Sequence, residues 1–369
     1  MNTTSNKRLL ALDVMRGITI AGMILVNNPG SWTYAYTPLT HAQWNGLTPT
    51  DLVFPFFMFI MGISTYISLR KYNFTFSTPA ALKIIKRTIV IFLIGIAINW
   101  FALLCYTHDP LPFAHIRILG VMQRLALCYG ASALIALLIK HKYIPYLIVA
   151  LLVGYFIILV TGNGFAYNET NILSIVDRSI LGDAHMYQDN HIDPEGLLST
   201  IPSIAHVLIG FCVGKLLMEV KDIREKLERL FLIGTILTFA GFLLSYGCPL
   251  NKKIWSPTFV LVTCGLGSSL LALLVWIIDI KGYKRWSHFF ESFGVNPLFI
   301  YVLADVLAIL LSVITYQGES ASLQQAFYAS TLQPVFGNEG GSLAYAILFV
   351  LLNWAIGYIL YKKKIYIKI

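Results

Sequence analysis

The sequence predicts an all-α, polytopic membrane protein of about ten transmembrane helices, and three observations support this prediction. Hydrophobic residues make up 57% of the chain and charged residues only 12%, whereas a soluble domain carries roughly 25% charged residues. The apolar residues gather in stretches of about 20, the length that crosses the hydrocarbon core of a bilayer. Lys and Arg occur mainly between these stretches. We therefore expect an integral membrane protein surrounded by a lipid bilayer.

The apolar stretches define the expected helices. The predicted spans are residues 9–27, 51–69, 84–105, 118–139, 143–161, 200–218, 228–246, 257–279, 288–315 and 341–361. Pro55 and Pro297 are compatible with spanning helices because neighbouring helices can satisfy the freed backbone groups. Neither a soluble domain nor an internal repeat is visible, so residues 1–369 are interpreted as a single transmembrane domain.

The basic residues predict the orientation, because Lys and Arg accumulate on the cytoplasmic side of a membrane. With ten helices and a cytoplasmic N-terminus, 21 of the 27 basic residues fall in cytoplasmic segments and four in external loops. The other two, Arg16 and Arg124, lie inside predicted spans. Both termini are therefore expected to be cytoplasmic, with long external segments near 28–50, 162–199 and 316–340.

Composition argues against several other classes of protein. The net charge is +9, but the basic residues form no continuous face, so nucleic acid is not an expected partner. The five cysteines contain no CxxC pair, which indicates neither a disulfide framework nor a zinc site. His185 and His191 lack a recognisable metal spacing, so no metal is expected. Asp13 and Arg16 interrupt the first apolar run, which favours a retained helix over a cleaved signal peptide.

Ionisable and amide side chains inside the predicted spans mark candidate functional positions, because such groups are costly in a bilayer. Asp13 and Arg16 are three residues apart and share one face of the first helix. Gln123 and Arg124 lie in the fourth predicted span, and Asn296 lies in the ninth.

Two interpretations of the buried charges remain open. Asp13 and Arg16 could neutralise each other near the cytoplasmic interface, with Arg124 a structural partner of an acid such as Asp305. Alternatively, Arg16 and Arg124 line a positive cavity for an anionic ligand, since a guanidinium group binds phosphate bidentately.

The loop before the second span holds the densest set of reactive groups. It combines His41, Trp44, Asn45 and Asp51. A neutral histidine is the usual proton carrier near neutral pH, and a Trp ring can support a sugar ring. Asn27, at the outer end of the first span, is placed to donate a hydrogen bond to a developing oxyanion. The alternative for His41 is a hydrogen-bonded turn residue without catalytic function.

Two acids in the second external loop also have two interpretations. Asp193 precedes Pro194, a pattern typical of a helix N-cap with Pro at the first helical position and Glu195 in the first turn. Capping would explain both carboxylates, and contact with a substrate is the other possibility.

Four blocks of sequence resemble the heparan-α-glucosaminide N-acetyltransferase-like transmembrane acyltransferases. They occur in the order found in that family and extend from about residue 8 to residue 300. The blocks are residues 8–17 with 26–27 and 41–62; residues 117–125; residues 177–196; and residues 249–256 with 294–296.

The resemblance implies an acyltransferase that uses cytoplasmic acetyl-CoA as co-substrate. The acetyl group would pass to the amine of glucosamine, or of a terminal glucosaminide, at the external face. Asn27 and His41 match the family's catalytic Asn and His by position. We assign five further residues to the acceptor and four to CoA. The acceptor residues are Trp44, Asn45, Asp51, Asp193 and Glu195, and the CoA residues are Arg16, Gln123, Arg124 and Asn296.

Some features depart from the lysosomal members of the family. Those members carry an extra lumenal region and helix before the first block, which predicts that this chain is a bacterial, inner-membrane member. The longer spacing from Asn27 to His41 predicts a different acceptor pocket. A homodimer is also implied by the resemblance. The alternatives are an O-acyltransferase of an envelope glycan and a non-enzymatic amino-sugar permease.

Overall fold

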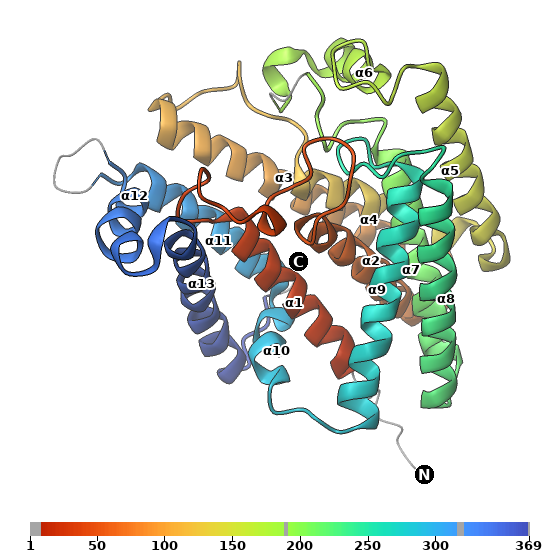
Figure 1. The fold of residues 1–369 in the computed structure, drawn as a ribbon. Coiled ribbons are helices and arrows are strands. Elements are labelled where there is room, and N and C mark those ends of the chain that lie inside the picture. Colours follow the sequence, from red (N-terminus) through yellow and green to blue (C-terminus); the bar gives the residue numbers. More distant parts are fainter. Residues whose placement is uncertain (1–8, 188–190, 316–320, 368–369) are drawn as a thin grey trace.

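The computed structural model describes residues 9–187, 191–315 and 321–367, and Figure 1 shows that this part of the chain is a bundle of helices. Every named element in these ranges is a helix. The predicted all-α fold is therefore confirmed. The described residues include nine helices that are long and apolar enough to cross a membrane, or ten if one bent pair is counted as a single span.

The first eight predicted spans each correspond to one long helix. These are α1 (Leu10–Asn27), α2 (Thr50–Leu69), α3 (Thr78–Thr107), α4 (Val121–Leu138), α5 (Ile144–Thr161), α7 (Thr200–Glu219), α8 (Ile223–Leu244) and α9 (Pro257–Leu274). The remaining helices are α6 (Ile172–Leu181), α10 (Ser287–Val295), α11 (Pro297–Val313), α12 (Leu323–Phe327) and α13 (Gln333–Lys362).

The ninth predicted span is not one continuous helix. It is divided into α10 and α11, which meet at an angle of 87°. Asn296, between them, has φ −124° and ψ 52°, outside the helical region. Pro297 follows as the first residue of α11, a position where proline's missing N–H leaves no hydrogen bond unmade. The predicted span over 288–315 is therefore a bent pair of helices, which makes a tenth span if the pair is counted as one.

The predicted loops contain more helix than the sequence indicated. The segment 162–199 includes α6, and the segment 316–340 includes α12 and the beginning of α13. Residues 316–320 lie outside the described residues. Gly337 interrupts α13 with φ 73°, a value that favours glycine.

Close packing of α2 against α7 holds the start of α2 in place. A Cβ atom on Gly62 would collide with the backbone carbonyl of Val207, and one on Gly210 would collide with that of Phe59. Small residues allow two helix backbones to touch in this way, which is a common mode of packing in membranes. The first turn of α2, which carries Asp51, is thus part of a rigid pair of helices.

The bundle has two ends, which α1 and α2 connect. The His41 end is where α1 ends and α2 begins, and the Arg16 end is where α1 begins and α2 ends. In Figure 1 the α1–α2 loop, the α8–α9 loop and α6 all lie at the upper side, which is the His41 end, and the α9–α10 connection lies at the opposite side. The cytoplasmic location of both termini stays a prediction.

Candidate active site

His41 and Asp51 form a hydrogen-bonded pair at the His41 end. Nδ1 of His41 is 2.7 Å from Oδ1 of Asp51. The second oxygen, Oδ2, accepts from the backbone N–H groups of Thr48 (3.0 Å) and Ala42 (3.1 Å) and from the Thr48 hydroxyl (3.0 Å). The Asp51 side chain is buried, whereas the His41 ring is 45% exposed.

The pairing defines the tautomer of the neutral ring. An ionised carboxylate can only accept hydrogen bonds, so Nδ1 of His41 carries the proton and donates a hydrogen bond to Asp51. Nε2 then keeps a lone pair that can take a proton from another group. The catalytic role of His41 stays a prediction.

Lys252 reaches the same ring from the α8–α9 loop. Its Nζ lies 3.1 Å from Nδ1 and 3.2 Å from Nε2 of His41, and 3.7 Å from Oδ1 of Asp51. Burial lowers the pKa of Lys252, against the raising effects of the Asp51 and Glu195 carboxylates. No pattern in the sequence predicted a role for Lys252, and its place in the block 249–256 was the only signal that pointed to it.

The loop that carries Lys252 is fastened to the loop that carries His41. Asn251 donates from Nδ2 to Oδ1 of Asn45 (3.2 Å), and the backbone N–H of Gly46 donates to the carbonyl of Leu250 (2.8 Å). Asn45, predicted to contact the acceptor, therefore holds two loops together in this structure.

Trp44 is held by the segment that follows α5. Its indole N–H donates to the carbonyl of Phe165 (2.9 Å), and its ring stacks on Tyr167 with centroids 4.5 Å apart. Lys253 donates to the Tyr167 hydroxyl (2.9 Å). One face of the predicted sugar platform is therefore covered by protein, and its contact with an acceptor stays a prediction.

Asp193 and Glu195 share one cation. Arg117 donates to both oxygens of Asp193, at 2.6 and 3.2 Å, and to Glu195 at 2.7 Å. These carboxylates raise the pKa of Arg117 above its usual value although burial opposes them. The predicted N-cap is wrong, because α7 begins only at Thr200 and has Ser199 at its N-cap. Asp193 instead closes a turn by accepting from the N–H of Glu195 (2.9 Å).

Asn27 is the last residue of α1 and is exposed at the His41 end. Its side chain has no hydrogen-bond partner among the residues that the structure describes. The chain just after it is fixed to α13, since Gly30 and Ser31 donate to the carbonyl and hydroxyl of Ser342. Its amide is thus available to a ligand, and its role as an oxyanion donor stays a prediction.

A cavity of about 770 Å³ opens at the Arg16 end, between α1 and α2. Arg16 donates to Asp13 (2.9 Å), to Ser64 (2.8 Å) and to the carbonyl of Gly294 in α10 (3.3 Å). Three cationic side chains and one carboxylate line it. Its lining residues are Leu9, Leu12, Asp13, Arg16, Ser64, Ile67, Ser68, Arg70, Lys71 and Met218. This cavity is suited to an anionic ligand.

Arg124 does not line that cavity. Its guanidinium group is buried and donates to the hydroxyls of Ser199 and Ser203 and to the carbonyl of Gly196 (3.0 Å). It also lies over the ring of Trp255, 5.4 Å from the centroid. These contacts tie α4 to the start of α7, so the structure separates Arg124 from Arg16.

The other predicted positions also make contacts within the protein. Asp305 interacts with Tyr301, so its predicted pairing with Arg124 is wrong. Gln123 packs against Gly95 of α3, and its Nε2 has no partner among the described residues. Asn296 donates to the carbonyl of Ile365 (2.8 Å) and accepts from the N–H of Ile367 (2.9 Å). Contact of Gln123, Arg124 and Asn296 with CoA stays a prediction.

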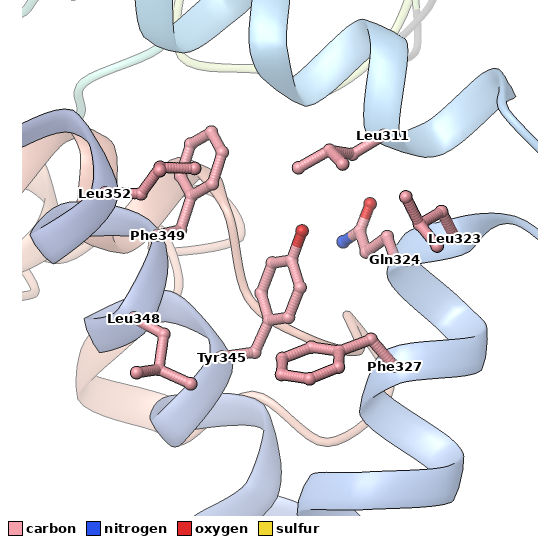
Figure 2. Close-up of a pocket in the computed structure, with 8 residues that line it drawn as sticks. All are labelled: Leu311, Leu323, Gln324, Phe327, Tyr345, Leu348, Phe349 and Leu352. Carbon is pink, nitrogen blue, oxygen red and sulfur yellow. The ribbon is translucent and has the colours of Figure 1, made fainter. Parts of the chain in front are cut away.

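A second pocket is almost entirely apolar. It measures about 270 Å³ and lies between α11, α12 and α13. Figure 2 shows the Tyr345 hydroxyl pointing toward its middle, with Gln324 at one side. Its lining contains no histidine, carboxylate or cation, and the hydroxyl of Tyr345 is the only titratable group in that lining.

These features define a class of protein: a polytopic membrane protein with a histidine–aspartate pair and a cation-lined cavity at opposite ends of the same two helices. Residues 8–246 match the family described as heparan-alpha-glucosaminide N-acetyltransferase, catalytic. The chain belongs to this family. The resemblance stated from the sequence is thus confirmed.

Two curated relatives share this similarity along nearly the whole chain. Heparan-alpha-glucosaminide N-acetyltransferase of Mus musculus is 28% identical over 99% of the chain and 61% of the relative. The protein of the same name in Homo sapiens is 30% identical over 98% of the chain and 60% of the relative. The chain thus spans about three fifths of the length of these relatives.

Proposed function

We propose that this protein transfers an acetyl group from acetyl-CoA to the amine of glucosamine or of a terminal glucosaminide. The donor is taken up at the Arg16 end, on the cytoplasmic side, and the acceptor binds at the His41 end, on the external side. The observation that carries the proposal is the pairing of a half-exposed His41 with a buried Asp51. The family and the names of the two relatives support the same chemistry.

The His41–Asp51 pair suits amine acylation. An amine must be neutral to attack a thioester, and a positioned base raises the rate by removing its proton. Nε2 of His41 is that base in the proposed mechanism, and Asp51 holds the ring through Nδ1 and stabilises the imidazolium that forms. The amide of Asn27 would donate to the oxyanion of the tetrahedral intermediate, which then expels the CoA thiolate.

The two ends are separated by a distance that an extended CoA molecule can bridge. Arg16 and Asn27 are 11 residues apart on α1, which corresponds to about 16 Å along the axis. Phosphates held by Arg16, Arg70 and Lys71 would leave the pantetheine arm to run between α1 and α2 toward His41. The proposed path therefore requires no transporter-like rearrangement.

One other mechanism and two other classes of protein are compatible with the same residues. His41 could instead attack the thioester itself and carry the acetyl group, because an imidazole is a competent nucleophile. An O-acyltransferase would use the same residue with a hydroxyl acceptor, whereas a permease would need neither the His41 base nor an anion site.

The test is acetyl transfer from labelled acetyl-CoA to glucosamine by purified, detergent-solubilised protein, with N-acetylglucosamine as the blocked acceptor. We expect transfer to the free amine only, and its loss in His41→Ala. The matched control is His108→Asn, which changes an exposed histidine at the same end and keeps a residue that tolerates its positive φ.

Each outcome decides between the classes. Near-normal turnover in His41→Ala would refute the role of His41. Transfer to N-acetylglucosamine as well would favour the O-acyltransferase, and an absence of both CoA binding and transfer would favour the permease.

A further inference from the structure

We propose that Lys252 is a positioning residue for the transfer, whose ammonium group balances Asp51 and keeps the His41 ring neutral and able to accept a proton. The inference rests on the proposed function and adds to it the group that sets the charge state of the base. It assigns a function to a cation that lies in a different loop, 211 residues away in sequence.

The geometry places opposite charges on the same ring. The Asp51 carboxylate, at 2.7 Å, favours the protonated imidazolium. The Lys252 ammonium, at 3.2 Å from Nε2, opposes a second positive charge at that nitrogen. Without Lys252, the Asp51 carboxylate would act on the ring unopposed and would favour a proton already on Nε2, which leaves no lone pair for the proton of the amine.

The other charged groups around His41 do not replace Lys252. Asp51 comes from α2, and Lys252 and Lys253 come from the α8–α9 loop. Lys253 turns away to the Tyr167 hydroxyl. Glu195 acts on Lys252 as a second carboxylate and helps to keep that side chain charged. Lys252 is thus the cation that contacts Nε2 among the residues that the structure describes.

The position of Lys252 is built into the fold. Its side chain is only 16% exposed. Most lysines lie at the surface, and a lysine is buried almost only when it is paired. The preceding residue, Asn251, bonds to Asn45 and accepts from the N–H of Ile254 (3.1 Å). Trp255, three residues on, is buried with φ 52°. A loop fastened at these points presents Lys252 to His41 in a fixed direction.

The experiment compares Lys252→Met with Lys252→Arg and with the neighbouring control Lys253→Met. The first readout is the pH dependence of acetyl transfer. In Lys252→Met the midpoint of the acid limb should rise by about one to two pH units, within the range that a nearby charge produces. The rate at a pH below that midpoint then falls about tenfold or more. Lys252→Arg should keep the wild-type profile, and Lys253→Met should follow the wild type.

A second readout needs no transfer activity. Diethyl pyrocarbonate modifies neutral imidazole, so the pH at which the His41 peptide becomes half-reactive, followed by mass spectrometry, reports the charge state of the ring. We expect this midpoint to rise in Lys252→Met and in Lys252→Gln, which serves as the second variant if the first does not fold.

The two readouts separate the inference from the proposed function. Coincident His41 reactivity curves in Lys252→Gln and wild type would overturn the role of Lys252 whatever the activity. A shifted curve in a protein that transfers no acetyl group would uphold the charge balance and refute the proposed function.

Discussion

Asp177 is a buried carboxylate on α6 that makes one hydrogen bond. Its Oδ1 accepts from the N–H of Leu197 (2.8 Å), and its Oδ2 has no partner among the described residues. Burial raises the pKa of Asp177 to about 6, and the Asp193 carboxylate adds to that effect. The Leu197 hydrogen bond and the Arg124 guanidinium oppose it. At neutral pH this group is therefore mostly ionised, in surroundings that penalise its charge.

We expect Asp177→Asn to stabilise the protein at pH 7.5 and to have little effect at pH 4. The folded-state pKa is raised above the unfolded value of 3.8, so the folded chain binds more protons between these values. Stability is then lost as the pH rises from about 4 to about 6. The asparagine avoids that loss, which is of the order of 2–3 kcal/mol. The measurement is the apparent Tm in detergent at both pH values. An equal shift at pH 4 and pH 7.5 would contradict the titration.

Asp51→Asn should impair catalysis without impairing the binding of acetyl-CoA. An amide preserves the size of the side chain but can no longer stabilise an imidazolium, and it lets the ring adopt the other tautomer. We expect kcat to fall about 100-fold or more, with acetyl-CoA binding little changed. Steady-state kinetics with glucosamine and binding of labelled CoA measure the two quantities. A variant with near wild-type kcat would show that His41 does not depend on its partner.

The residues of this site differ in whether the sequence alone can predict them. His41, Asp51 and Asn27 could be selected from the sequence because a short loop joins them or because they match a family block. Lys252 and Arg117 could not be paired with their carboxylates, because those contacts join segments far apart in the chain. Spacing in the sequence carries no information about such distances.

Among the helices, α1 and α2 do most to connect the two candidate substrate regions. Both helices line the cavity at the Arg16 end and flank the reactive loop at the other. At the Arg16 end of α2, Arg70 and Lys71 are adjacent and both line that cavity. Because cationic side chains bind phosphate groups, these two predict a contribution to acetyl-CoA binding that can be removed without changing the His41 end.

We expect the double variant Arg70→Gln, Lys71→Gln to raise the KM for acetyl-CoA about 30-fold or more and to leave the KM for glucosamine and kcat nearly unchanged. The physical reason is the loss of charge-assisted hydrogen bonds to phosphate, each contributing about 1–3 kcal/mol. The control is Lys83→Gln, Lys86→Gln, which removes two charges from α3 that do not line the cavity. An equal effect in the control would indicate general electrostatics rather than a binding site.

The elements were predictable where one signal dominated. An apolar stretch of about 20 residues was sufficient to place each of the first eight long helices. The break between α10 and α11 was visible only as Asn296 followed by Pro297, which a spanning helix often tolerates. At the break, Asn296 bonds to Ile365 and Ile367 of the C-terminal segment. A local sequence pattern gives no information about a tertiary contact of that kind.

At the scale of the whole molecule, the two candidate regions face opposite ends of the bundle. Figure 1 places the α1–α2 and α8–α9 loops together at one end and the α9–α10 connection at the other. The clustering of Lys and Arg predicts that the Arg16 end is cytoplasmic. A single static bundle with sites on both faces predicts transfer across the membrane without passage of either whole substrate.

Sealed vesicles test this directly. With acetyl-CoA confined to the Arg16 side and glucosamine to the His41 side, we expect N-acetylglucosamine to form on the His41 side at the rate seen in detergent. Reversing the two substrates should abolish product, because neither acetyl-CoA nor its phosphates can cross the hydrocarbon core. The sidedness of the vesicles is established by labelling a single introduced cysteine in the exposed α9–α10 connection with a membrane-impermeant reagent. Product formed equally in both arrangements would contradict a two-sided site, and product on the Arg16 side would show that the sugar is carried inward before it is acetylated.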